Sequence, residues 1–318
     1  MENRGHDAAT AQFRLDWVDV ARGIGIIAVV AGHVWTRGPV RDALYSFHMP
    51  LFFLLSGLLS RPRPIGSFTR RQITGQMRPY AAFLIMLLIA DQIIEPMKGN
   101  APIYRHWPQD VGPILLGGTW LGGPFIIFWF VPCLMVARIA FNMALNRWPD
   151  PLDRRWALLI APLALLAYGL GWLFDASPLG LLTVPMAVLL LWIGAAWPHV
   201  RWRNGLILPL GLLAGAGLSG LVPTLNMKVA DYGWPLLSIG AGVATSLLLF
   251  RLSARVARFA WPLQHIGRAS LVIMYLHGAI IHYAGLSFPK VWLFVLALVA
   301  PYLVWQLLRL TSLRRVFL

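Results

Sequence analysis

Three ionisable side chains lie in one apolar stretch near the start of the chain, at Asp19, Arg22 and His33. Asp19 and Arg22 are three residues apart, a spacing at which two helical side chains can form an ion pair. The 11-residue spacing of Arg22 and His33 is roughly 16 Å of rise and about three turns in a continuous helix. Both side chains then face the same neighbour. One elongated ligand along this face could contact Arg22 at one end and His33 at the other.

Two further histidines occupy strongly apolar segments: His48, with Pro50 two residues later, and His277. An ionisable side chain inside a membrane helix costs at least about 2.5 kcal/mol on insertion scales. Imidazole can also exchange protons near neutral pH. Each histidine is therefore a candidate for chemistry, and a buried hydrogen-bonding role is the alternative.

Asp91 and Glu95 are spaced four residues apart near the end of another apolar stretch. At this spacing the two carboxylates share one face of a helix. They could hold sugar hydroxyls or a proton, and solvation at the membrane interface is the alternative interpretation.

Sequence signatures of soluble enzymes are missing. The sequence has no P-loop, HExxH or GxSxG motif. No helical pair of histidines four residues apart and no cysteine cluster accompanies His33, His48 and His277, so we predict no metal site.

The composition favours a membrane protein, because 58% of residues are hydrophobic and only 12% are charged. A membrane-spanning helix needs about 20 mainly apolar residues, since its backbone polar groups must be satisfied within the segment. We predict an all-α integral membrane protein, a bundle of about ten transmembrane helices. The predicted spans are 16–36, 43–60, 79–96, 122–145, 156–174, 178–197, 205–222, 235–250, 270–286 and 290–310.

The net charge of +15 would suggest nucleic acid as a partner of a soluble protein, but here the positions of the charges matter more. Most basic residues fall in alternate segments between the predicted spans, and the positive-inside rule then places both termini in the cytoplasm. We therefore expect the lipid bilayer, and no nucleic acid, as a partner. Basic inner segments also suit anionic lipid headgroups.

The chain is predicted to form a single transmembrane domain, residues 1–318, with a short polar cytoplasmic segment at 1–15. The first apolar stretch is too long for a signal peptide and is expected to remain as the first helix. The single cysteine, Cys133, lies in an apolar run and is predicted to be a packing residue.

Taken together, these motifs resemble the acyltransferase-3 family of integral membrane O-acyltransferases, in particular its fucose 4-O-acetylase-like branch. The resemblance extends over nearly the whole chain. Its most specific element is an arginine followed, after ten residues, by a histidine. This element is Arg22 with His33; the other matching segments are 47–53 with Ser56-Gly57, 68–80, 128–132 and 267–277.

The resemblance implies an O-acyltransferase, with acyl-CoA, usually acetyl-CoA, as co-substrate and no tightly bound cofactor. The implied acceptor is a hydroxyl of a carbohydrate or cell-envelope glycan, and the implied location is the bacterial cytoplasmic (inner) membrane. Some relatives carry an additional extracytoplasmic hydrolase-like domain, which these 318 residues do not include. A polysaccharide-biosynthesis partner is therefore expected for an external acceptor.

On this basis, site residues can be predicted for each step. His33 is the predicted general base or acyl-accepting nucleophile, with Arg22 essential beside it and His48 as a second catalytic candidate. We predict that CoA phosphates bind Arg22 and a basic inner loop, because guanidinium groups match phosphate oxygens. The loop residues are Arg70, Arg71 and Arg78, and the predicted substrate-binding residues are Asp91, Glu95, Trp129 and His277.

Two alternatives without acyl transfer remain open at this point. A transporter or flippase for a glycan or small solute would also place polar residues inside a ten-helix bundle. However, no pair of interrupted segments in the two halves indicates inverted repeats. The third possibility is a non-catalytic partner in polysaccharide export.

Overall fold

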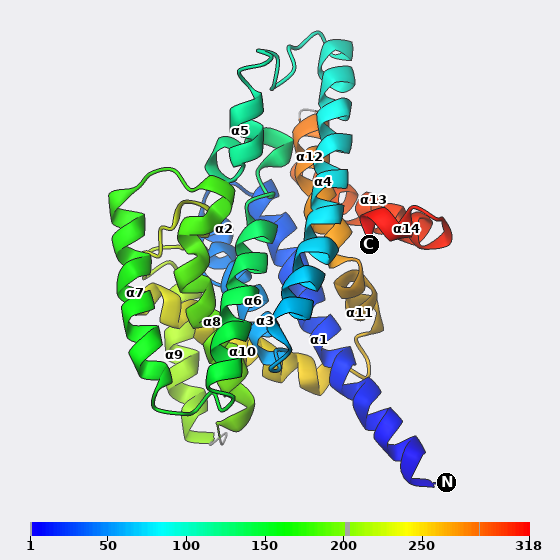
Figure 1. Ribbon diagram of the computed structural model, residues 1–318. Helices are drawn as coiled ribbons and strands as arrows, with labels where there is room; N and C mark the ends of the chain where they lie inside the picture. Colours follow the sequence, from blue (N-terminus) through cyan, green and yellow to red (C-terminus); the bar gives the residue numbers. More distant parts are fainter. Residues whose placement is uncertain (1, 201–203, 286) are drawn as a thin grey trace.

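The computed structural model (Figure 1) describes residues 2–200, 204–285 and 287–318, and the side chains of 16–200, 205–285 and 287–318. Within them the chain is helical, and the single β-bridge joins Asn226 to Asp231. Arg4, Arg14, Arg201 and Arg203, which enter the charge argument, have side chains outside this description. The α-helices are α1 Glu2–Val34, α2 Pro39–Tyr45, α3 His48–Leu58, α4 Ile65–Met97, α5 Val111–Leu116, α6 Phe130–Arg147, α7 Trp156–Leu173, α8 Val184–Ala196, α9 Ile207–Leu218, α10 Leu237–Val256, α11 Trp261–Arg268, α12 Ser270–Ala284, α13 Lys290–Leu310 and α14 Arg314–Phe317. The 3₁₀ helices are η1 Gly118–Trp120, η2 Gly123–Phe125, η3 Pro178–Thr183, η4 Trp197–His199, η5 Asn204–Leu206 and η6 Met227–Val229.

The all-α membrane fold is confirmed. In the described part of the chain, seven helical segments are long and apolar enough to cross a membrane. They are Asp16–Val34, Ile65–Met97, Gly123–Arg147, Trp156–Leu173, Pro178–His199, Leu237–Val256 and Lys290–Leu310. Ile207–Leu218 and Ser270–Ala284 are shorter apolar helices. The count of ten spans and the cytoplasmic position of the termini stay predictions.

The second predicted span, 43–60, is wrong as a continuous helix. It consists of α2 and α3, which meet at Ser46 and Phe47. Pro50 explains the break, because its ring would clash with the carbonyl of Ser46 in a continuous helix. In the first turn of a new helix the missing N–H of proline costs nothing. Most of α3 is buried, and it packs against α1, α8 and α10.

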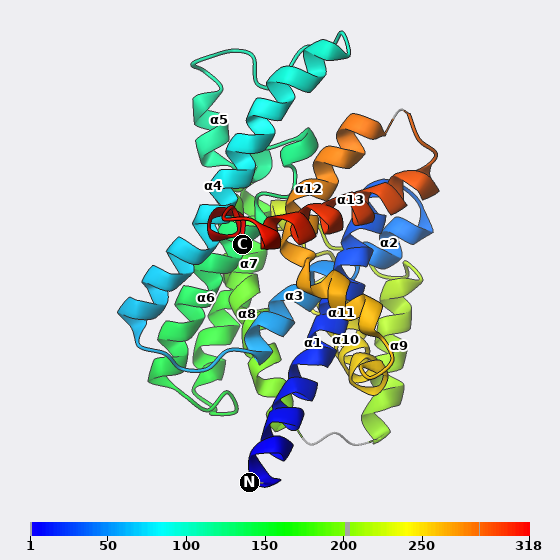
Figure 2. The same ribbon diagram turned by 90° about the vertical axis from the view of Figure 1, so that its right-hand side faces the viewer.

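The basic stretch with Arg70, Arg71 and Arg78, which the sequence predicts as a loop, is helical in the structure. Arg70, Arg71 and Arg78 belong to α4, whose 33 residues extend about 50 Å. The helix is therefore longer than the roughly 30 Å hydrocarbon core of a bilayer. Figure 2 shows α4 as a long helix inclined across the molecule. The three arginines lie along its N-terminal half, outside the buried core.

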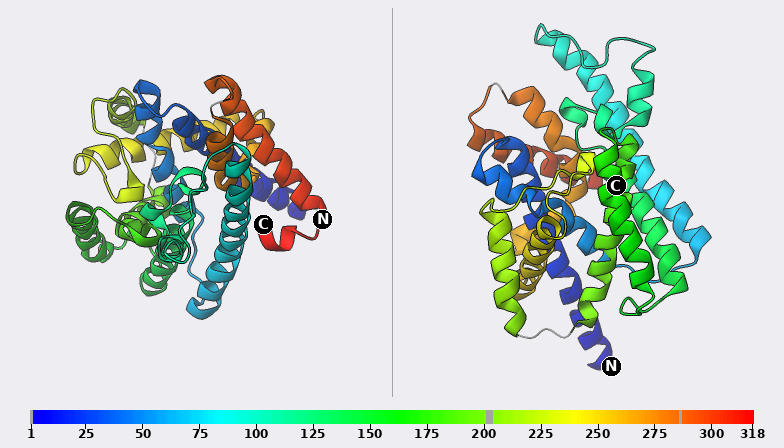
Figure 3. Two further views of the ribbon diagram at one scale, coloured as in Figure 1. Left: turned by 90° about the horizontal axis from the view of Figure 1, so that it is seen from above. Right: turned by 90° about the vertical axis from the view of Figure 1, so that its left-hand side faces the viewer.

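Helix α13, the last long helix, crosses the other helices instead of following them. It packs on α12 and α1 and lies at a steep angle to α9 in Figure 2, and Figure 3 shows it from above. Phe294 of α13 meets Trp35, just after α1, with ring centroids 5.4 Å apart. Helix α13 thus covers the end of α1 that carries His33.

Glycines set the closest helix crossings. A Cβ on Gly57 of α3 would lie 1.9 Å from the carbonyl oxygen of Leu191, and one on Gly194 of α8 would lie 2.0 Å from that of Leu54. The two backbones are therefore in direct contact, which small residues permit between membrane helices. This crossing holds α3 firmly against α8.

We expect Gly57→Ala to destabilise the protein by about 1–3 kcal/mol, because the added methyl group must push two backbones apart. The measurement is the thermal unfolding midpoint of the purified protein in detergent. Gly169→Ala in α7 is the matched control, since a Cβ there meets no atom within 4 Å. Equal midpoints for the two variants would contradict the proposed crossing.

Candidate active site

A cavity of about 320 Å³ lies between α1, α3, α6 and the junction of α11 with α12. Arg22 and His33 of α1 both line it, together with Phe52 and Ser56 of α3. Helix α1 is continuous from Glu2 to Val34, so the 11-residue spacing brings both side chains to one face. The cavity therefore connects a guanidinium and an imidazole three helical turns apart.

Asp19 forms ion pairs with two arginines. Its Oδ1 accepts a hydrogen bond from the Arg22 guanidinium at 3.4 Å, and its Oδ2 accepts one from Nε of Arg268 at 3.0 Å. Arg268 also lies 3.4 Å from Asp16. The sequence predicts the Asp19–Arg22 pair, but it gives no sign that Arg268, 249 residues away, joins it. Asp19 thus links α1 to the end of α11.

The contact between α1 and α11 depends on two glycines. A Cβ on Gly23 would lie 2.2 Å from the Leu263 carbonyl oxygen, and one on Gly267 would lie 1.9 Å from that of Asp19. Since neither position has room for a side chain, the helices touch through their backbones. This close approach brings Arg268 beside Asp19 at the edge of the cavity.

His277 is the histidine nearest to His33. The two ring centroids are 5.2 Å apart. Nδ1 of His277 lies 2.9 Å from the Ile273 carbonyl oxygen, whereas its Nε2 is buried and without a partner. Because a carbonyl can only accept, Nδ1 carries the proton and Nε2 keeps a free lone pair. The pair of rings places an unused proton acceptor beside His33.

His48 lies further from the cavity. Its Nδ1 contacts the Leu44 carbonyl oxygen at 2.7 Å, and the ring packs edge-on against Tyr45, with centroids 4.7 Å apart. Tyr45 also meets the His33 ring at 6.2 Å, and the Arg41 guanidinium lies 4.3 Å above the Tyr45 ring. His48 is thus connected to His33 through Tyr45 and is not part of the cavity lining.

The other predicted residues divide into two groups. Trp129 lines the cavity and is only 7% exposed. Arg70, Arg71 and Arg78 do not line it. Arg78 instead donates to the main-chain carbonyl of Arg315. The structure therefore brings Trp129 to Arg22 and His33 but leaves the α4 arginines outside.

Comparison with known proteins adds one finding to this geometry. Residues 15–310 match the family Acyl_transf_3, described as an acyltransferase domain. The chain belongs to the acyltransferase-3 family. No significant match was found among curated proteins or among solved structures. The family and the apolar helices together describe a multi-pass membrane acyltransferase.

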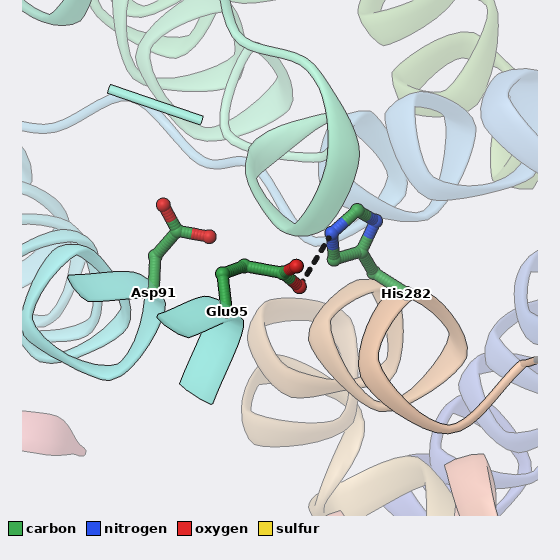
Figure 4. Close-up of side chains that lie close together, drawn as sticks. All are labelled: Asp91, Glu95 and His282. Carbon is green, nitrogen blue, oxygen red and sulfur yellow. Dashed lines mark ion pairs between the residues drawn. The ribbon is translucent and has the colours of Figure 1, made fainter. Parts of the chain in front are cut away.

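A second group of polar residues lies away from this cavity. Figure 4 shows Asp91 and Glu95 of α4 close to His282 of α12. Nε2 of His282 is 3.4 Å from a Glu95 oxygen. Both carboxylates are buried, so solvation at an interface does not describe them. Their predicted role in substrate binding stays a prediction.

The hydrogen bonds of Asp91 show what it does for the fold. Its Oδ2 accepts from the Ile103 main-chain N–H at 2.8 Å, and its Oδ1 accepts from the Tyr283 hydroxyl at 3.1 Å. Asp91 therefore ties the loop after α4 to α12. Asp91, Glu95 and His282 each offer one possible metal-ligand atom, and these three atoms lie within 4.8 Å of one another. Among the described residues, this is the only group with such a geometry that could hold a metal ion.

Lys228 is a basic residue near the other end of the cavity. It is one of the charged neighbours of His33, and its Nζ donates to the Leu121 carbonyl oxygen at 2.7 Å. Burial lowers the pKa of Lys228 from the ordinary value of 10.5 to about 8. Near neutral pH the side chain is thus mainly charged, and it loses its proton within the mildly alkaline range.

We expect Asp91→Ala to lower the stability by about 1–3 kcal/mol, because it leaves the partly buried Ile103 N–H without its acceptor. Tyr283→Phe removes only one hydrogen bond and is expected to cost about 1 kcal/mol. Thermal unfolding in detergent measures both. An unchanged midpoint for Asp91→Ala would contradict the role of this carboxylate as a tie between α4 and α12.

The amine of Lys228 is expected to become reactive with a midpoint near pH 8, since only the neutral amine is nucleophilic. Burial in the folded protein disfavours the charged amine, so Lys228 destabilises the fold when it is protonated. This destabilisation is relieved as the pH rises from the folded-state pKa of about 8 towards the ordinary pKa of 10.5. Pulse labelling with an acylating reagent, followed by peptide mass spectrometry, measures the midpoint. Lys228→Arg identifies the peptide, and a midpoint above pH 10 would contradict the effect of burial.

Proposed function

We propose that this acyltransferase is an O-acyltransferase that moves an acyl group, most simply acetyl, from acyl-CoA to a hydroxyl of a carbohydrate or cell-envelope glycan. The supporting observation is the cavity that contains both Arg22 and His33. A cation for the donor and a base for the acceptor are then accessible to one bound molecule. The proposal includes a bacterial inner membrane, with the termini on the side where acyl-CoA is made.

In this proposal the donor lies along α1. The Arg22 guanidinium binds a CoA phosphate, and the pantetheine arm extends over the roughly 16 Å to His33. Phe52 and Trp129 give this path apolar walls. The arginines of α4, Arg70, Arg71 and Arg78, add positive charge outside the cavity, where they attract the anionic donor before it enters.

Two chemical routes are open at His33. As a general base, it takes the proton of the acceptor hydroxyl while the oxygen attacks the thioester carbonyl; the C–S bond breaks and the thiolate leaves. As a nucleophile, His33 attacks the thioester and forms an acyl-imidazole with release of the thiolate. The acceptor oxygen then attacks the acyl carbon, the C–N bond breaks, and the released imidazole takes up the hydroxyl proton. Both routes give an ester and, after protonation of the thiolate, free CoA.

The surrounding residues have supporting roles in either route. Nε2 of His277 can take up a proton that His33 has accepted, because the rings are neighbours. His48 positions Tyr45 against His33. Asp91 and Glu95, on the far part of α4, are the proposed contacts for acceptor hydroxyls, and Trp129 is the proposed apolar surface for the substrates.

The first test uses purified protein in nanodiscs with radiolabelled acetyl-CoA and native glycans. We expect His33→Ala, which removes the proposed base, to lower the rate of CoA release by about 100-fold to 10 000-fold. Arg22→Ala, which removes the proposed phosphate contact, is expected to lower this rate by about 10-fold or more. Label retained on the protein would indicate the acyl-imidazole route.

His199→Ala is the matched control, because this histidine is exposed at the end of η4. Unfolding midpoints establish that each variant is folded. A wild-type protein that neither binds nor consumes acyl-CoA in the presence of its glycans would refute the proposal and favour a transporter. Full activity of folded His33→Ala would refute the assigned base.

A further inference from the structure

Arg138 is a charged residue in an apolar membrane-spanning segment, Gly123–Arg147. It lines the cavity with Arg22, and its Nε is buried without a hydrogen-bond partner. Its charged neighbours are Arg22 and Arg63, both cations. A guanidinium in this position has a high energetic cost unless an anion compensates it. No described protein group forms an ion pair with Arg138, so a ligand can fill this role.

Arg268 is a third cation at the same edge of the cavity. Asp19 is shared between Arg22 and Arg268, and each arginine side chain remains 39% exposed. None of the residues lining the cavity is acidic. Three guanidinium groups therefore face the cavity. The adjacent carboxylates, Asp16 and Asp19, both pair with Arg268, and neither pairs with Arg138.

The beginning of α12 strengthens this positive end. Ser270 is its first residue and lines the cavity beside Arg268. Free N–H groups in the first turn of a helix, together with its dipole, favour an anion. The hydroxyl of Ser270 is an additional donor. Guanidinium, hydroxyl and main-chain donors are together the groups that bind phosphate in proteins.

We propose that Arg138 and Arg268, with Arg22, form a phosphate-binding subsite at this end of the cavity. The expected ligand is a phosphate ester. This assignment rests on the proposed function, and the phosphates that we assign to the subsite are the nucleotide phosphates of CoA. A phospholipid headgroup is the other source of the same chemistry. The subsite lies inside the bundle, so the arginines on α4 guide the donor and do not hold it.

Calorimetric titration of the protein in zwitterionic nanodiscs with CoA, adenosine 3′,5′-bisphosphate and pantetheine tests the subsite. We expect Arg138→Gln and Arg268→Gln to weaken CoA and bisphosphate binding by about 10-fold to 100-fold. Binding of pantetheine, which has no phosphate, is expected to be unchanged. Arg147→Gln, the same change at an exposed position of α6, is expected to leave all affinities unchanged.

Arg138→Gln decides the test if Arg268→Gln fails to fold, because Arg138 has no ion pair within the described residues that the substitution would break. Equal CoA affinity in Arg138→Gln, Arg147→Gln and wild type overturns the subsite.

Native mass spectrometry separates the two sources of phosphate. If wild type binds no CoA but retains a phospholipid that Arg138→Gln loses, the subsite stands and the acyl-CoA proposal fails. If wild type consumes acetyl-CoA and Arg138→Gln does so with the same KM, the acyl-CoA proposal stands and the subsite fails.

Discussion

An arginine in an apolar helix must be solvated by something other than lipid, and this requirement shapes the region around Arg22. Asp19 supplies one counter-charge from the preceding turn of α1, and the cavity supplies space for a polar ligand. The cost of a charge in a bilayer is high, so such a residue is expected to face a partner or a polar cavity. Helices α3, α6, α11 and α12 line this cavity together with α1.

Backbone contact at glycines holds several of the surrounding helices together. Gly23 and Gly267 allow α11 to touch α1, and Gly57 and Gly194 do the same for α3 and α8. Dispersion forces over such close surfaces stabilise membrane proteins, because lipid gives no hydrophobic drive between helices. The same contacts fix Arg268 beside Asp19 and keep α3 as one wall of the cavity.

The sequence predicted the parts of this arrangement that depend on local spacing. Composition indicated the all-α membrane class, and helical periodicity placed Arg22 and His33 on one face. It could not show that Arg268 joins Asp19 or that His277 adjoins His33, because these contacts join distant segments. Arg138 lies within the predicted span 122–145, but only the cavity shows which residues it faces. Pro50 indicates the break before α3, whereas hydropathy alone predicts one continuous span over 43–60.

Asp19 also has a consequence for the strength of ligand binding. As the carboxylate shared by Arg22 and Arg268, it competes with any anion that approaches these guanidinium groups. A bound phosphate has to displace part of this internal pairing, so the free energy of binding is smaller than the number of arginines suggests. An internal competitor of this kind speeds dissociation, since the carboxylate is ready to take the place of the leaving ligand. If the donor is acyl-CoA, as proposed, rapid release would let free CoA be exchanged for a new donor in each reaction cycle.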